Sequence, residues 1–259
     1  MIRSLRAGLS GGALLLGLAA SSAQAHSPYL LPSAFDASDR KVVTVQGAFT
    51  ESFFTPEVAM KSDAYAVVGP DGVRVPLKPT YFTEMAVVEA PVATPGTYRI
   101  TTGLRAGRTA KAAKVDGEWR FFEDGQAPAD AIDMRSLTLA EVYVSHGAPN
   151  DAALAPIGKG LEFHAVTHPS KITTGQDATF EVLFDGQPLS GQPITLNAAD
   201  DRYADAKAAP RTVTSDAKGR FAIKVDRSGV YQIQTRYRVA SPGQPGQSFT
   251  YALTFEALR

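Results

Sequence analysis

Histidine is the residue type in this chain best suited to binding a metal, and it is rare. The sequence contains four histidines, His26, His146, His164 and His168, and no cysteine. Imidazole nitrogen suits Cu(II), Ni(II) and related ions, whereas thiolate zinc sites, iron–sulfur clusters, cysteine nucleophiles and attached c-type haem all require cysteine. Any metal bound by this chain must therefore use histidine, carboxylate, methionine, tyrosine or backbone ligands.

His26 directly follows a segment with the pattern of a secretory signal peptide. Residues 1–25 contain two early arginines, an apolar run over residues 13–20, and the small-x-small tripeptide Ala23-Gln24-Ala25. The apolar run is too short to span a bilayer, which needs about 20 residues. The sequence therefore predicts export to the periplasm, cleavage after Ala25 and a mature protein that begins at His26, without a transmembrane helix.

Cleavage at this position would place a free amino group and an imidazole on the same residue. Their ordinary pKa values, about 7.7–8.0 and about 6.5, allow both to lose a proton near neutral pH. Together they can chelate Cu(II), Ni(II) or Co(II), as in the histidine brace of some secreted copper proteins. Pro28 has no amide proton, which excludes a site that deprotonates the amide of the third residue. The alternative interpretation is that histidine stands at this position by accident.

Two further histidines lie close together in the second half of the chain. Residues 161–167 are expected to form a strand, so that Glu162, His164 and His168 share one face. His164 and His168 would then be about 13 Å apart, too far to bind one ion directly. We therefore expect His26 to be the anchor of a metal site, with His164, His168 and Glu162 as partners across a domain interface. The alternative is that these histidines simply face solvent on a sheet.

The charge balance and the absence of catalytic motifs narrow the function. The chain has 26 basic and 26 acidic residues, and removal of residues 1–25 leaves 24 and 26, a net charge of −2. This balance does not favour a nucleic-acid partner. The sequence contains no Gly-x-Ser-x-Gly elbow, HExxH motif, Walker A loop or dinucleotide fingerprint in the mature chain. We therefore expect a protein that is not an enzyme and that needs no organic cofactor.

Short runs rich in valine, isoleucine, phenylalanine, tyrosine and threonine alternate with turn residues along the mature chain. Asp116-Gly117 and Asp185-Gly186 are two-residue hairpin signals between such runs. The pattern predicts an all-β protein with two immunoglobulin-like β-sandwich domains. We expect the first sandwich at residues 26–125, a linker or connection at 126–156, and the second sandwich at 157–259.

The second half resembles carboxypeptidase-regulatory-like and related immunoglobulin-like modules. The resemblance rests on residues 184–191, 215–221 and 229–231. Modules of this kind usually act as spacers or present surfaces to proteins and carbohydrates. The resemblance therefore implies a fold more than a function.

Over nearly the whole mature chain, the sequence resembles the NikM-like family of exported bacterial proteins (domain of unknown function 4198). The resemblance is carried by His26 after the signal peptide and by the short motifs at residues 29–33, 69–72, 141–144, 161–163, 168–169, 183–186 and 251–255. Members of this family are often described as periplasmic components of nickel or cobalt uptake. The resemblance implies a membrane or outer-membrane metal-uptake system as partner.

These observations lead to one expected function and two alternatives. We expect a periplasmic protein that binds nickel, cobalt or copper, or a metal complex, for uptake or handling. The first alternative is a β-sandwich interaction or accessory module that binds no metal. The second is a copper enzyme with a histidine brace, which would need a second histidine and usually an axial tyrosine, for which Tyr29 is a candidate.

Overall fold

The computed structural model describes residues 26–123, 125–203, 211–241 and 243–259, and the predicted signal peptide at residues 1–25 lies outside this part. The described residues form strands, turns and three short 3-10 helices, without an α-helix, and none of their helices is long and apolar enough to cross a membrane. The predicted all-β sandwich class is confirmed. The 3-10 helices are η1 (Ala152–Leu154), η2 (Pro169–Lys171) and η3 (Ala199–Tyr203).

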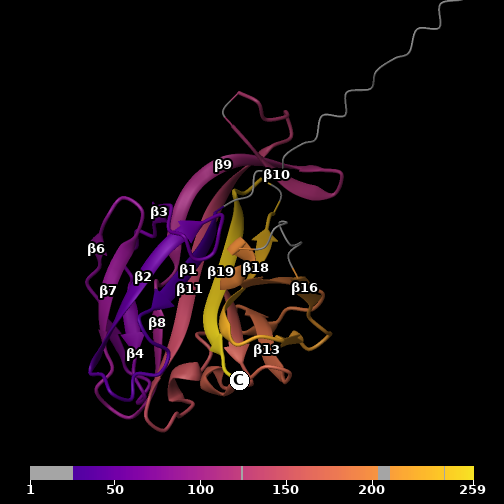
Figure 1. Cartoon of the computed structure of the whole chain (residues 1–259). Coiled ribbons are helices and arrows are strands. Elements are labelled where there is room, and N and C mark those ends of the chain that lie inside the picture. Colours follow the sequence, from indigo (N-terminus) through magenta and orange to yellow (C-terminus); the bar gives the residue numbers. More distant parts are fainter. Residues whose placement is uncertain (1–25, 124, 204–210, 242) are drawn as a thin grey trace, which may run out of the picture.

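The strands form three sheets, which we call the N-terminal, central and C-terminal sheets (Figure 1). The N-terminal sheet contains β1 (Ser27–Pro32), β2 (Val42–Thr50), β3 (Val58–Ala59), β6 (Thr80–Tyr81) and β7 (Ala86–Pro91). The central sheet contains β4 (Ala66–Val68), β5 (Arg74–Pro76), β8 (Gly96–Thr101), β9 (Arg105–Val115), β10 (Glu118–Phe122), β11 (Ile132–His146), β15 (Pro193–Ala198), β16 (Arg211–Thr214), β18 (Gly229–Val239) and β19 (Gly246–Ala257). The C-terminal sheet contains β12 (Leu161–Ala165), β13 (Asp177–Phe184), β14 (Gln187–Pro188) and β17 (Arg220–Lys224).

The central sheet runs through both halves of the chain. Its 15-residue strand β11 pairs antiparallel with β8 and β9 and parallel with β19, the last strand of the chain. This strand lies in the middle of residues 126–156, the segment that the sequence predicts to be a linker or connection. Val142, Tyr143 and Val144 favour an extended backbone, and burial on both faces stabilises it there.

Strand β11 divides two hydrophobic cores, because successive side chains of a strand point to opposite faces. Ala140, Val142 and Val144 pack in the N-terminal core, between the N-terminal sheet and the β4–β8 part of the central sheet. Leu139 and Tyr143 pack in the C-terminal core, between the C-terminal sheet and strands β15, β18 and β19. The two sandwiches are thus built on opposite faces of one continuous sheet, with β11 and β19 in the middle (Figure 1).

The two predicted hairpins are confirmed. Asp116 and Gly117 both have positive φ angles, 54° and 83°, and connect β9 to β10. Asp185 and Gly186, with φ angles of 49° and 74°, connect β13 to β14. This backbone geometry favours the Asp-Gly pair, because most other side chains are strained at positive φ.

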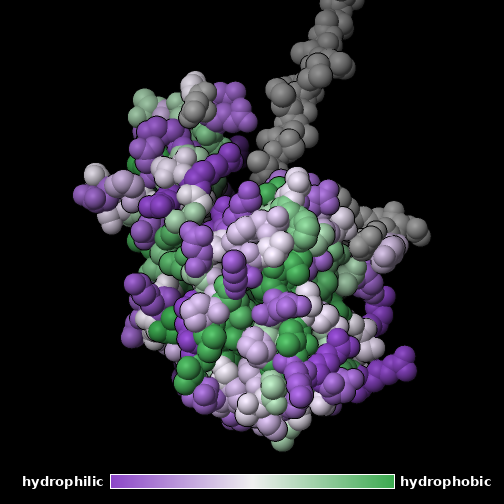
Figure 2. All heavy atoms as spheres, turned by 90° about the vertical axis from the view of Figure 1, so that its left-hand side faces the viewer, coloured by the Kyte–Doolittle hydropathy of each residue, from purple (hydrophilic) through white to green (hydrophobic). Residues whose placement is uncertain are grey.

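The N-terminal sheet side exposes apolar side chains among polar ones (Figure 2). The large exposed hydrophobic residues of this half of the chain include Val42, Val58, Val73, Val75 and Phe82. They are scattered over several strands and turns, as single exposed hydrophobic residues commonly are.

Candidate metal centre

His26 lies beside two glutamates at one end of the N-terminal sheet. Strands β1 and β2 pair in a register that joins Ser27 to Thr50, so the next residues, His26 and Glu51, stand opposite each other. Strand β3 pairs with β2 through Phe49 and Val58, which places Glu57 beside the same strand end. Three neighbouring strand ends thus converge here.

The three side chains are close enough to bind one ion. The His26 Nε2 atom lies 3.0 Å from Glu57 Oε2 and 3.8 Å from Glu51 Oε1. Two ligands with metal bonds of about 2.1 Å lie at most about 4.2 Å apart, so both distances are compatible with a shared ion. Within the described residues, this is the one group of three or more histidine and carboxylate side chains with such spacing.

The Glu57 carboxylate is held in place by its second oxygen. Its Oε1 atom accepts a hydrogen bond of 2.8 Å from the Glu51 backbone N–H and one of 3.3 Å from the Thr50 hydroxyl. Oε2 is left facing His26. Partners of this kind orient a metal ligand before the ion arrives, which strengthens metal binding.

The loop between Glu51 and Glu57 is anchored by aromatic packing. The Tyr29 ring contacts Phe53 and Phe54 edge-on, with centroid distances of 6.3 and 5.0 Å. Tyr29 is buried, its hydroxyl accepts a hydrogen bond from Gln46, and burial raises its pKa to about 12. This tyrosine therefore supports the loop from within the protein and stays protonated at neutral pH.

His164 lies on the outer side of the C-terminal sheet with an acidic partner of its own. Its Nδ1 atom is 3.1 Å from Glu181 Oε2, and Glu181 Oε1 accepts a 2.9 Å hydrogen bond from Arg220 Nε. The His164 hydrogen bond, followed by that of Arg220, lowers the pKa of Glu181. The three side chains form an ion-paired cluster across neighbouring strands.

His168 joins the two halves of the protein. The expected strand ends at Ala165, and His168 instead caps η2, where its Nδ1 atom accepts a 3.1 Å hydrogen bond from the Ser170 backbone N–H. Its Nε2 atom lies 2.9 Å from Thr97 Oγ1. Burial lowers its pKa, so the neutral imidazole is favoured. Both ring nitrogens thus have structural partners.

Glu162 stabilises the loop that precedes its own strand. Its two carboxylate oxygens accept hydrogen bonds of 2.7 Å from the backbone N–H groups of Ile157 and Gly158. The side chain is 1% exposed, and burial raises its pKa. This carboxylate acts as a local clamp on the polypeptide backbone.

The expected set of four ligands does not form one cluster in the described structure. His26 has Glu51 and Glu57 as neighbours, whereas His164, His168 and Glu162 each have different partners. Sequence reasoning missed Glu51 and Glu57 because it did not predict β1. The useful signal was the run Ser27–Pro32, whose pairing with β2 determines what stands opposite His26.

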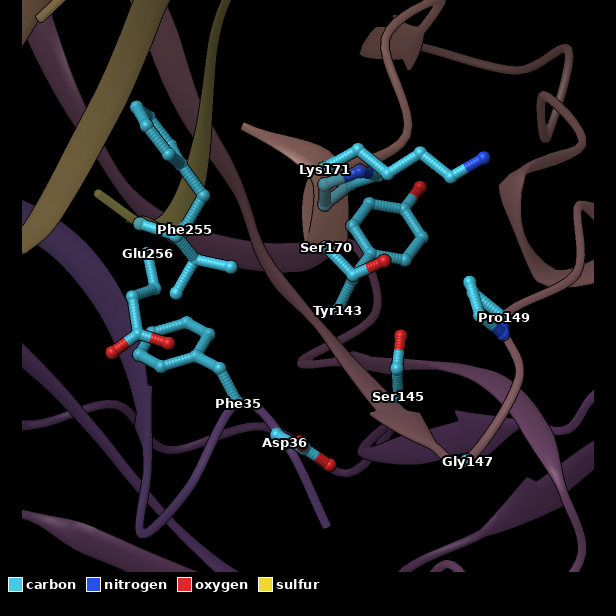
Figure 3. A pocket seen from close by; sticks show the side chains of 12 residues that line it. Phe35, Asp36, Tyr143, Ser145, Gly147, Pro149, Ser170, Lys171, Phe255 and Glu256 are labelled. Carbon is cyan, nitrogen blue, oxygen red and sulfur yellow. The ribbon is translucent and has the colours of Figure 1, made fainter. Parts of the chain in front are cut away.

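A cavity of about 310 Å3 lies away from the His26 cluster, where β11, β19 and η2 meet (Figure 3). Tyr143, Ser170 and Lys171 line one side, and Phe35 and Glu256 line another. The Tyr143 hydroxyl is buried, and the Arg99 guanidinium lies near it. The lining contains no histidine and carries charges of both signs, so it is a poorer metal site than the His26 cluster.

Comparison with known proteins shows the family of the chain. Residues 23–239 match the domain of unknown function DUF4198, and the chain belongs to this family. No match to a curated protein is found.

Several solved structures are similar to the chain at low identity. The D0-D1 domain of intimin is 13% identical, with 89% of this chain and 97% of that chain covered and a TM-score of 0.23. The Escherichia coli adhesin FdeC is 16% identical, with 90% and 63% covered and a TM-score of 0.22. A DUF4785 family protein from Legionella pneumophila is 10% identical, with 80% and 50% covered and a TM-score of 0.23. These scores are too low to support any argument about function.

Proposed function

We propose that this protein is a periplasmic, non-enzymatic carrier that binds nickel, cobalt or copper at His26, Glu51 and Glu57 for uptake or handling. The observation that carries the proposal is the 3.0 Å approach of His26 Nε2 to a glutamate whose other oxygen is already held by the backbone. One imidazole and two carboxylates offer nitrogen and oxygen ligands that suit divalent transition metals.

Cleavage of a signal peptide after Ala25 would add the amino group of His26 to this set. The small-x-small tripeptide before His26 supports such cleavage. The NikM-like resemblance supports nickel or cobalt as cargo and a membrane or outer-membrane uptake system as partner. The immunoglobulin-like second half would then serve as the scaffold.

The geometry favours a carrier over a histidine-brace enzyme. A brace needs a second histidine at the metal, whereas the cluster in the described structure contains one histidine and two carboxylates. A brace enzyme also usually has an axial tyrosine, but the hydroxyl of the candidate, Tyr29, is buried and accepts a hydrogen bond from Gln46.

Metal titration of the processed protein tests the proposal. The protein should begin at His26 and carry no histidine tag, and Ni(II), Co(II) and Cu(II) should be titrated separately by calorimetry. We expect binding near one ion per chain, weakened about ten-fold or more by His26→Ala. A form with one extra residue before His26 should also bind more weakly, because its amino group is displaced. His164→Gln is the matched control and should bind as the unchanged protein does. Equal affinity of the His26→Ala variant would refute the proposal.

A further inference from the structure

An arginine-rich pocket adjoins the metal cluster. It has a volume of about 770 Å3, and both His26 and Glu51 line it. The pocket is also lined by three arginines, Arg105, Arg108 and Arg236. Among the described residues that line it, Glu51 is the single carboxylate. The pocket therefore joins an acidic metal cluster to a surface of the opposite charge.

The register of four neighbouring strands builds the floor of this pocket. Thr138 on β11 stands opposite Arg105 on β9 and beside Thr250 on β19. Thr250 in turn stands opposite Arg236 on β18. These pairings form a row of four residues across the sheet, in the order Arg105, Thr138, Thr250 and Arg236. Neighbouring strands are about 4.8 Å apart, so the backbone positions of Arg105 and Arg236 are about 14 Å apart. Two hydroxyls lie between two guanidinium groups.

The arginines of this row lack acidic partners. Arg236 donates from Nε to Thr250 Oγ1 over 3.1 Å, and Arg105 donates from Nε to the Lys61 carbonyl oxygen over 2.8 Å. Neither forms an ion pair with a carboxylate in the described part of the chain, nor does the exposed Arg108. Their remaining N–H groups are free to bind an anion.

A second guanidinium group lies near Arg236 on β18 and adds to the positive charge there. Arg238 lies two residues beyond Arg236 on the same face, and its Nε atom is buried without a hydrogen-bond partner in the described structure. Burial, together with Arg238, lowers the pKa of Arg236. Arg238 has the negative charge of Glu118 nearby, whereas Arg236 has no ion-pair partner in the described structure. A buried charge without a partner is costly, and an anion beside Arg236 and the hydroxyl row would offset that cost.

We propose that this pocket binds the carboxylates of a small anionic chelator, so that the cargo is a metal–polycarboxylate complex and not a bare ion. The inference rests on the proposed metal function of His26. Three side-chain ligands, or four with the amino group, leave positions of a tetragonal Ni(II) or Cu(II) ion open for a chelator. The chelator's free carboxylate would then accept hydrogen bonds from Arg236 and Thr250, because guanidinium groups bind carboxylates in a fork. With a guanidinium group at each end, the row offers donors for two carboxylates, which a di- or tricarboxylate carries and a single phosphate does not.

Calorimetry with three probes tests the inference on the processed full chain. The probes are nickel chloride, an equimolar nickel–citrate complex, and citrate alone. Arg236→Gln should weaken nickel–citrate binding about ten-fold or more, and should leave bare nickel within about two-fold of the unchanged protein. Arg236→Lys keeps the charge but loses the fork, so an intermediate loss is expected. Arg135→Gln, an exposed charge on the other face of β11, is the matched control and should change neither.

The outcomes separate this inference from the proposed function. Bare nickel binding with no effect of Arg236→Gln on nickel–citrate would overturn the chelator inference and leave the carrier proposal standing. Arg236-dependent citrate binding without nickel binding would refute the carrier and the metal complex, and leave only an anion site. Inorganic phosphate that displaces citrate at equal concentration would overturn the commitment to polycarboxylates. Circular dichroism of each variant confirms that a loss of binding is not a loss of fold.

Discussion

At the scale of single residues, the candidate centre depends on how well one carboxylate is oriented. Glu57 is one-third exposed and is held by the Glu51 backbone N–H, whereas the Glu51 side chain is 57% exposed and lies farther from His26. An ordered ligand loses less conformational entropy on binding than a mobile one. The two glutamates should therefore contribute unequally.

The first prediction ranks these glutamates. Glu57→Gln should weaken Ni(II) binding more than Glu51→Gln does, by about ten-fold against about two- to three-fold. Calorimetric titration of both variants under the same conditions measures the difference. A larger effect of Glu51→Gln would show that the orientation of Glu57 is not what determines affinity.

The second prediction concerns pH and the His164 cluster. The pKa of Glu181 in the folded protein lies below its ordinary value of 4.5, chiefly because of the His164 hydrogen bond. A lowered carboxyl pKa stabilises the fold above pH 4.5, and that stability is lost as pH falls through the folded pKa. Glu181→Gln should therefore cost about 0.5–1 kcal/mol near pH 7 and less toward pH 3. Thermal unfolding midpoints from pH 7 to pH 3 measure this difference, and a constant difference would contradict the assignment.

At the scale of elements, close approach of strands and turns determines where side chains can stand. Gly47 on β2 lies against the Tyr65 ring, whose hydroxyl donates to the Met60 carbonyl oxygen over 2.9 Å. A Cβ atom at residue 47 would collide with the Tyr65 hydroxyl and touch Leu30 at 3.0 Å. Glycine is needed there for space, and the same strand carries Glu51 just beyond its end.

The third prediction follows from this contact. Gly47→Ala should destabilise the protein by about 1–3 kcal/mol, because a buried tyrosine must move. Gly107→Ala is a suitable control, because the atom nearest to the added Cβ would be Ser136 Cβ at 3.2 Å, and a small shift of Ser136 would relieve that contact. Urea unfolding measures both free energies. Equal losses for the two variants would show that the Tyr65 contact does not set the cost.

The elements that could be predicted from sequence are those with local signals. The Asp116-Gly117 turn fixes a hairpin through its own backbone geometry, and the alternating runs indicate strands. The pairing of β1 with β2 is not local, and it alone brings Glu51 to His26. The sequence predicts a strand up to residue 167, but the strand ends at Ala165, and the His168 ring accepts a hydrogen bond from the Ser170 backbone N–H. The register of the strands and the positions where they end therefore determine which side chains meet at the site, and no short sequence motif predicts either.

At the scale of the whole molecule, the two sandwiches share β11 and β19. Each face of β11 belongs to a different core, so neither core is complete without the strand that crosses both. Residues 126–156, which the sequence predicts to be a linker or connection, contain this buried strand because β11 contributes side chains to both cores. It also places the arginine row of the central sheet beneath the N-terminal sheet that carries His26, since Gln232 on β18 donates to the Pro28 carbonyl oxygen over 3.0 Å.

The fourth prediction is that both cores unfold together. Ile100→Ala in the N-terminal core and Ile233→Ala in the C-terminal core each remove a fully buried side chain and should each cost about 2–5 kcal/mol. Urea unfolding followed by circular dichroism should show one transition, shifted by either variant. Two transitions, of which each variant shifts only one, would show that the sandwiches are independent domains.

Anomalous X-ray diffraction from crystals of the processed protein soaked with Ni(II) tests the central claim most directly. We expect one strong peak between His26 Nε2 and the carboxylates of Glu51 and Glu57, within about 2.0–2.2 Å of each ligand. A peak at His164 or His168 instead, or no peak near His26 in a well-ordered soaked crystal, would contradict the account.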